Sequence, residues 1–233
     1  MDWVAGVDGF KSQWCVVLLN LRTEERCARI VPTFSGLLEI PEQPSIVCVD
    51  IPIGLPEVTL PGGRSCEREA RRLLGSKASS VFSALGRTAL KGSSQPDASA
   101  RNRAAGGVGI SAQAWGLSKK LREADEAMTP ERQRLVYEVH PEVSFWALNE
   151  NRPMAARKKS PEGAAERAEV LSKDGFPREF VQQLPTGLRV GLDDFLDACV
   201  AAWTAQRIST GQAGRLPVRT ECDARGLDMA IWY

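Results

Sequence analysis

Residues 46–56 read Ile-Val-Cys-Val-Asp-Ile-Pro-Ile-Gly-Leu-Pro, an apolar run that is interrupted by a carboxylate, Asp50. The unbroken apolar stretch from Ile46 to Val49 is typical of a strand that is buried on both faces of a sheet. Such strands belong to α/β proteins, in which helices cover both faces. Asp50 would end this strand, either as a functional group or only as the residue that shapes the following turn.

The segment before this strand has the pattern of a three-stranded antiparallel meander. Short polar turns separate its three apolar runs, which are Val4–Val7, Trp14–Leu19 and Cys27–Val31. Asp8 directly follows the first run, although Asp8-Gly9 would also suit a simple hairpin turn. Thr33 or Ser35 can cap a short helix that continues to Ile40.

The segment after this strand, residues 57–130, has the composition of a long insertion. Gly, Ser, Pro and Arg are frequent in it. It contains two helical patterns, Cys66–Leu74 and Ala112–Ala127, and we expect a mobile loop between them. Arg68 and Arg71 in the first helix could bind a substrate, or they could only pair with neighbouring glutamates.

The remaining chain predicts a fifth strand and several helices. Leu135–Val139 is the strand candidate and carries Glu138. Helical patterns begin at Val143 and at Ser160-Pro161. Asp193 or Asp194 then caps a long apolar helix that runs to Ile208. We expect a single domain over residues 1–210 and a weakly patterned C-terminal tail over residues 211–233.

The acidic residues stand out by their positions at the ends of apolar elements. Buried carboxylates are costly unless something pairs with them. Mg²⁺ or Mn²⁺ would do so, because hard cations prefer carboxylate oxygens. Two such ions could hold the attacking and leaving oxygens of a phosphodiester. The candidate catalytic or metal-binding acids are Asp8, Asp50, Glu138, Asp194 and Asp197.

Two further polar features carry both a functional and a structural interpretation. His140 is the only histidine in the chain. It could move protons or contact a phosphate, or it could be a hydrogen-bonded structural residue. Lys159, in Lys158-Lys159-Ser160, could neutralise phosphates or belong to a solvated surface.

Composition limits the classes of function. Among 233 residues, 43% are hydrophobic and 25% are charged, which is typical of a globular protein. The 30 basic and 29 acidic residues give a net charge of +1, so we do not expect binding of nucleic acid by bulk charge alone, although a local basic patch could still bind it.

The same composition indicates a compartment. No apolar run approaches the ~20 residues of a membrane span, and residues 1–10 do not resemble a secretory signal. The six cysteines are scattered and contain no Cys-x-x-Cys pair, so we expect reduced core thiols and a cytoplasmic protein.

Several motifs together resemble the domain of unknown function 429 family, which is described as predicted nucleases of the ribonuclease H fold. The resemblance extends from Val4 to about Arg207. It is carried by Gly6-Val7-Asp8-Gly9, residues 50–56, Cys66-Glu67-Arg68-Glu69-Ala70-Arg71, Ser79-Ser80-Val81-Phe82, residues 138–145 and residues 193–198.

The resemblance implies an α/β, ribonuclease H-like fold, with a mixed five-stranded sheet flanked by helices and an insertion after the fourth strand. In that fold the metal-binding acids lie on the first strand, after the fourth strand and on a late helix, where this chain has Asp8, Asp50 and Asp197. The Asp194-x-x-Asp197 spacing is similar to that of Holliday-junction resolvases of the RuvC type. Those resolvases have no obvious counterpart to Glu138-x-His140 or to the insertion.

The expected function is therefore a nuclease that uses Mg²⁺ or Mn²⁺ held by Asp8, Asp50 and Asp197, with Glu138 or Asp194 completing the site. Nucleic acid, DNA or RNA, is the expected partner, and a homodimer is possible. One alternative is a phosphotransferase acting on a small phosphorylated molecule, although the kinases that share this core need two such halves. The other is a non-catalytic module for nucleic acid or protein, whose carboxylates should diverge or pair with arginines.

Overall fold

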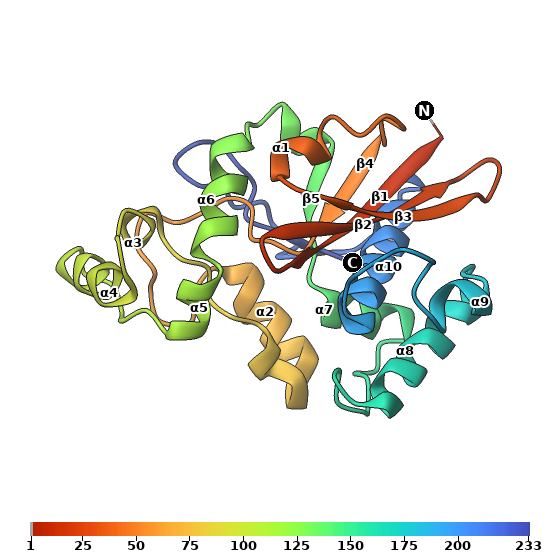
Figure 1. Cartoon of the computed structure of the whole chain (residues 1–233). Helices are drawn as coiled ribbons and strands as arrows, with labels where there is room; N and C mark the ends of the chain where they lie inside the picture. The colour runs from red at the N-terminus through yellow and green to blue at the C-terminus, as the bar shows by residue number, and fades with distance from the viewer. Residues whose placement is uncertain (1) are drawn as a thin grey trace.

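The computed structural model describes residues 2–233 and has a five-stranded mixed sheet at its centre (Figure 1). The strand order is β3-β2-β1-β4-β5. This confirms the α/β class and the mixed sheet. The strand bounds are β1 (Trp3–Phe10), β2 (Gln13–Asn20), β3 (Arg26–Val31), β4 (Ile46–Val49) and β5 (Val136–Glu138).

The first three strands form the predicted antiparallel meander, and β4 and β5 then add in parallel to β1. This arrangement is consistent with a ribonuclease H-like fold. The interpretation of Asp8-Gly9 as a hairpin turn is wrong, because both residues pair within β1. The turn lies at Lys11 and Ser12, and Lys11 has a φ of 49°, the left-handed conformation that such tight hairpins require.

Both faces of the sheet are covered, as the apolar β4 predicts. On one face, Val7 and Val49 pack in a core with the short helix α1 (Phe34–Leu37) and with α6 (Ser118–Ala127). On the other face, Val4 and Cys48 pack against the long apolar helix α10 (Leu192–Ser209). Three further helices lie on the side of α10: α7 (Pro141–Leu148), α8 (Pro161–Lys173) and α9 (Arg178–Val181).

The insertion is more ordered than the sequence predicts. The expected mobile loop contains the 3-10 helix η1 (Gly75–Ser80), α3 (Arg87–Leu90) and α4 (Gln95–Ala104). The Ser94 side chain caps α4, and Pro96 occupies its first turn. The predicted first helix is α2 (Ser65–Leu74), whereas the second is divided at Leu117 into α5 (Ala112–Gly116) and α6. The short 3-10 helix η2 (Arg132–Arg134) follows.

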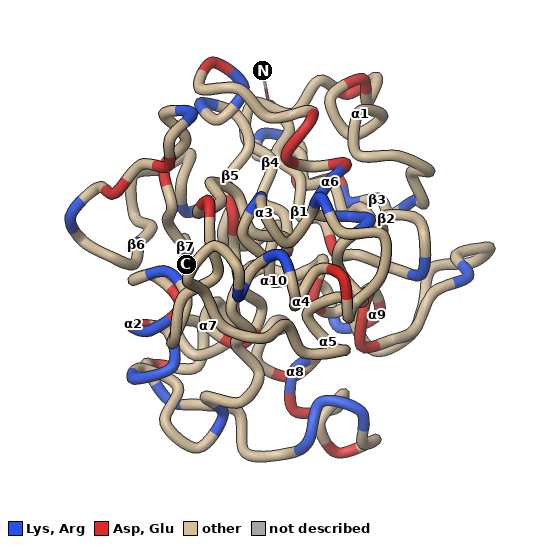
Figure 2. The backbone as a smooth tube through the Cα atoms, turned by 90° about the vertical axis from the view of Figure 1, so that its left-hand side faces the viewer, with Lys and Arg blue, Asp and Glu red and all other residues tan. Residues whose placement is uncertain are grey.

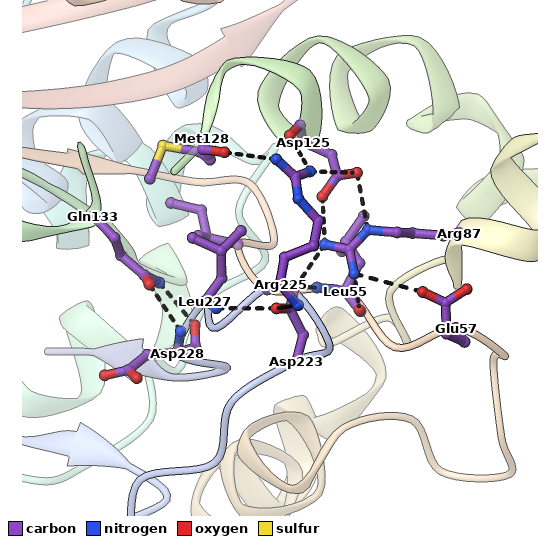
Figure 3. Close-up of polar contacts among 12 residues, drawn as sticks. Leu55, Glu57, Arg87, Asp125, Met128, Gln133, Asp223, Arg225, Leu227 and Asp228 are labelled. Atoms are coloured by element: carbon purple, nitrogen blue, oxygen red, sulfur yellow. Dashed lines mark hydrogen bonds and ion pairs between the residues drawn. The ribbon is translucent and has the colours of Figure 1, made fainter. Parts of the chain in front are cut away.

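The C-terminal segment packs on the domain instead of extending from it. Its strands β6 (Arg215–Leu216) and β7 (Ile231–Trp232) pair with each other, and Trp232 forms a bridge with Val139 after β5. Asp223 accepts hydrogen bonds from the Arg87 guanidinium (2.6 Å) and from the Leu55 amide (3.0 Å), so the segment contacts the insertion (Figure 3).

Charges of both signs are distributed along the backbone tube in Figure 2, in agreement with the net charge of +1. All six cysteines are unpaired thiols, and four of them, Cys15, Cys48, Cys66 and Cys199, are buried. Within residues 2–233, no helix combines the length and the apolar character that a membrane crossing requires.

Candidate metal centre

A glycine brings the first strand and the last long helix into direct contact. A Cβ atom at Gly6 would lie 2.0 Å from the Ala202 nitrogen and 2.2 Å from the Ala198 oxygen, both in the backbone of α10. Asp8 lies two residues further along β1, so its side chain points to the same face of the sheet. Asp197 precedes Ala198 on α10. The close approach at Gly6 therefore places Asp197 beside Asp8.

Asp50 reaches the same place from the neighbouring strand. It directly follows β4, and its amide donates a hydrogen bond of 2.9 Å to the Val7 carbonyl on β1. Because β1 and β4 are parallel, Asp8 and Asp50 both lie at the carboxyl end of the sheet. The parallel pairing stops at Val7 and Val49, so both acids lie just beyond it.

The three carboxylates Asp8, Asp50 and Asp197 form one cluster, which we call the acidic triad. Each contributes a carboxylate oxygen, and these oxygens all lie within 4.8 Å of one another. Asp8 is 6% exposed and Asp197 is 3% exposed, while Asp50 is partly buried. The triad offers only oxygen ligands, which is the donor set that Mg²⁺ and Mn²⁺ prefer.

The electrostatics of the acidic triad are unbalanced. Burial raises the pKa of Asp8 well above its ordinary value, and the charges of Asp197 and Asp50 raise it further. Burial likewise raises the pKa of Asp197 to about 7, although the ammonium of Lys158 opposes this shift. Close like charges with little water disfavour ionisation. An additional cation beside the triad would therefore stabilise its ionised carboxylates.

Lys158 partly meets this demand. Its Nζ lies 2.5 Å from Asp197 Oδ2. It is the one cation of residues 2–233 that forms an ion pair with the triad. Burial lowers the pKa of Lys158, but the charges of Asp197 and Asp8 outweigh this effect and raise it overall. The lysine thus remains charged at neutral pH.

The acidic triad lines a cleft of about 790 Å³ whose other lining includes seven basic residues and four glutamates. The walls come from the insertion, from the β1–β2 turn and from the loop before α8. Figure 1 shows α6 standing beside the β1–β2 hairpin. Five lining residues form no ion pair within the described chain: Lys11, Lys77, Lys119, Lys120 and Arg157. These five residues are the positive charges of the lining that an anionic group could contact.

Glu138 lines the same cleft, but its carboxylate belongs to a second charged cluster, which it forms with Arg64 and Glu67. The guanidinium of Arg64 donates to both of its oxygens, at 2.6 and 2.8 Å, and the Ile53 amide donates at 2.7 Å. Arg64 also binds Glu67 at 2.7 Å. Burial raises the pKa of Glu138 to about 7, against the lowering effect of Arg64. The oxygens of Glu138 are not among the three that come together in the triad.

His140 and Asp194 take different positions. His140 lines the cleft, with Nε2 3.3 Å from the Ser80 carbonyl oxygen and with its buried Nδ1 lacking a partner among the described residues. Asp194 lies in the first turn of α10, whose N-cap is Gly191, and not an aspartate as predicted. Burial and Asp193 raise the pKa of Asp194. Asp194 belongs neither to the triad nor to the cleft lining.

The three basic residues that were predicted to bind substrate lie outside the cleft lining. Arg68 and Arg71 donate hydrogen bonds to the insertion: Arg68 to the Gly63 carbonyl and Arg71 to Gly62, Val81 and Ser83. Lys159 does not line the cleft, whereas its neighbour Lys158 does.

Lys158, Arg64 and the lysines that line the cleft are functional candidates that no sequence pattern distinguishes from other basic residues. Of these residues, only Lys158 has a recognisable place in the sequence, two positions before Ser160, the N-cap of α8. The sequence pattern does not show which of two adjacent lysines faces the acids. Arg64 lies 74 positions from Glu138, and no local pattern connects them.

Comparison with known families places the chain in one of them. Residues 6–221 match the family described as "Protein of unknown function (DUF429)". The chain belongs to this family, as the motifs predict. No curated protein and no solved structure matches the chain.

Proposed function

We propose that this protein is a nuclease that depends on a divalent metal ion and hydrolyses phosphodiester bonds of nucleic acid. The observation that carries this proposal is the convergence of Asp8, Asp50 and Asp197, from three distant segments, within 4.8 Å at a cleft lined by lysines. A structural accident would have to bring three carboxylates together, two of them buried, with a single ion-pair partner among them.

The chemistry of the acidic triad fits Mg²⁺ or Mn²⁺. All three donors are carboxylates, and burial raises the pKa values of Asp8 and Asp197, with the neighbouring carboxylates raising them further. When bound, such an ion would supply Lewis-acid polarisation of a phosphoryl oxygen and a lowered pKa for the attacking water.

The side chains of the cleft would perform the remaining tasks. Lys11, Lys119 and Arg157 would bind phosphate oxygens and orient the strand. Lys158 holds Asp197 in the metal-free protein and would become free to bind phosphate once a metal ion neutralises the triad. His140 also lines the cleft, and because its Nε2 faces the Ser80 carbonyl, the buried Nδ1 is the ring nitrogen that is left as an acceptor.

A binding module without catalysis predicts carboxylates that diverge or pair with arginines. Glu138 fits that description, since Arg64 holds it on both oxygens. The triad does not fit it, because its members converge and share a single lysine. The triad therefore favours the nuclease.

The first test is a calorimetric titration of Mn²⁺ and of Mg²⁺ into the wild type, Asp8→Asn and Asp197→Asn. The control is Glu179→Gln, which changes an exposed acid on α9. We expect saturable binding to the wild type and to the control, and loss of binding in the other two variants. Binding that is indifferent to both aspartates, also with a short oligonucleotide present, would overturn the proposal.

The second test is activity. Labelled single-stranded and duplex DNA and RNA are incubated with Mn²⁺ or Mg²⁺, and ATP turnover is measured in parallel. The nuclease predicts shortened oligonucleotides without ATP turnover. ATP consumption with intact oligonucleotides would instead favour the phosphotransferase.

A further inference from the structure

An aromatic side chain is exposed on the wall of the cleft. Phe82 follows η1 in the insertion, lines the cleft and is 44% exposed. Leu117, at the junction of α5 and α6, lines the same cleft and is 36% exposed. Exposed apolar side chains that gather at a cleft often mark a binding site.

The segment around Phe82 is held firmly from behind. Arg71 of α2 donates hydrogen bonds of 2.9 Å both to the Val81 carbonyl and to Ser83 Oγ, on either side of Phe82. The Ala84 amide donates to Glu67 at 2.9 Å. These bonds fix the backbone on both sides of the ring. A fixed ring loses little conformational freedom when a ligand stacks on it.

A hydrogen bond between two segments closes one side of the cleft in the insertion that carries Phe82. Lys77 Nζ, on η1, donates a hydrogen bond of 3.0 Å to the Ala156 carbonyl, in the loop that carries Lys158. This contact joins the insertion to the loop before α8 at one side of the cleft. The cleft volume of about 790 Å³ lies within the range of ligand pockets, so the cleft would hold only a short part of a strand.

We propose that the cleft binds an unpaired, single-stranded segment of nucleic acid, with one base stacked on the ring of Phe82. This inference rests on the proposed nuclease function and specifies its substrate class. The lysines of the lining neutralise the backbone, and the aromatic ring accepts a base of any sequence, which together are the two elements of single-strand recognition.

A base within a duplex does not satisfy this arrangement. Both of its faces are covered by neighbouring bases, so it must first be unstacked, which costs a few kcal/mol. An unpaired base offers its face without that cost.

The test measures affinity by fluorescence anisotropy, with a 12-nucleotide single strand and the blunt duplex of the same sequence, in DNA and in RNA form. The proteins are the wild type, Phe82→Ala, Phe82→Trp and Val218→Ala, the last being an apolar control that is 84% exposed and does not line the cleft. Cleavage is excluded by replacing Mg²⁺ with Ca²⁺.

We expect the single strand to bind the wild type at least tenfold more tightly than the duplex. Phe82→Ala should weaken single-strand binding by roughly 5- to 150-fold, the range that stacking of one base supplies. Phe82→Trp should retain it, and Val218→Ala should not change it. The DNA and RNA arms show which of the two is preferred.

The outcomes separate this inference from the proposed function. Duplex binding as tight as single-strand binding, or an unchanged affinity in Phe82→Ala, overturns the inference even if the protein cleaves nucleic acid. Absence of binding to every oligonucleotide overturns both. Single-strand binding that depends on Phe82 in a protein without cleavage supports the inference and contradicts the nuclease.

Discussion

Two groups of buried acids lie at the carboxyl end of the same sheet, and they differ in how their charge is balanced. In one group, Arg64 serves two carboxylates, Glu67 and Glu138. In the other, Lys158 serves the three carboxylates of the acidic triad through a single contact with Asp197.

The difference follows from the shape of the two cations. A planar guanidinium has five N–H donors, so Arg64 binds both oxygens of Glu138 and still reaches Glu67 and the Ile53 carbonyl. An ammonium is a compact charge that sits on one carboxylate. The first group is therefore complete within the protein, and the second is suited to an ion from outside. The predictions below test this distinction.

The largest expected effect is on activity. Asp50→Asn removes one charge of the acidic triad and should reduce the proposed nuclease activity by about 10³-fold or more, because metal-ion stabilisation is worth several kcal/mol. Initial rates of oligonucleotide cleavage measure the loss, with Glu179→Gln as the control. A variant with more than a tenth of the wild-type rate would show that Asp50 does not belong to the catalytic centre.

The second prediction concerns the complete group. Arg64→Met leaves Glu67 and Glu138 buried without their cation, so the free energy of unfolding should fall by about 3–5 kcal/mol. Urea denaturation measures this change. Arg68→Met is the matched control, since Arg68 donates only to the exposed Gly63 carbonyl, and we expect a change within about 0.5 kcal/mol. Equal losses in both variants would contradict the comparison.

The third prediction is a dependence of stability on pH that the acidic triad should cause. Asp197 has a pKa of about 7 in the folded, metal-free protein, above its ordinary value of 3.8. Between these values the folded state binds more protons than the unfolded state, so stability falls as the pH rises from about 4 to about 7. The full pKa shift of Asp197 corresponds to a loss of at most about 4 kcal/mol in the free energy of unfolding.

Thermal unfolding at pH 5 and pH 8 measures this dependence. Asp197→Asn should lose less stability than the wild type between the two values. Asp8 and Glu138 also have raised pKa values, so the informative quantity is the difference between variant and wild type. Mg²⁺ should stabilise the wild type more at pH 8 than at pH 5. Identical pH profiles for both proteins would contradict the interpretation.

The smallest expected effect comes from the lysine itself. Lys158→Met removes the cation that competes with a metal ion for Asp197. The variant should therefore bind Mg²⁺ roughly tenfold more tightly, which corresponds to about 1.4 kcal/mol in the free energy of binding. Lys159→Met should leave the affinity unchanged. Calorimetry at constant pH measures both variants. Weaker Mg²⁺ binding in Lys158→Met would mean that this lysine supports the site instead of occupying it.

The sequence predicts those parts of the fold and site that depend on local periodicity. The unbroken apolar run of β4, the meander before it and the apolar face of α10 all appear as predicted. Each of Asp8, Asp50 and Asp197 stands at a fixed place on one of these elements. Their side-by-side arrangement in the structure therefore follows from the strand order and from the glycine contact at Gly6.

The contacts that the sequence did not predict are made between distant segments. The polar composition of residues 91–110 does not predict α4, although Ser94 as its N-cap and Pro96 in its first turn are typical of a helix start. The sequence around Arg71 would look the same if this arginine bound substrate or if it supported the segment around Phe82. Only its hydrogen bonds to Val81 and Ser83 in the folded protein distinguish the two roles. The same applies to Arg64, which finds its partners in two different segments.

The separation of Asp8 and Asp197 along the chain has a consequence during protein synthesis. These two acids lie at opposite ends of the folded sequence, and α10 must pack on Gly6 before they meet. A ribosome adds about 5–20 residues per second, so Asp197 emerges roughly 10–40 s after Asp8. An unfinished chain has no acidic triad during that interval. The proposed metal centre is therefore completed only after α10 has been synthesised and has packed on β1.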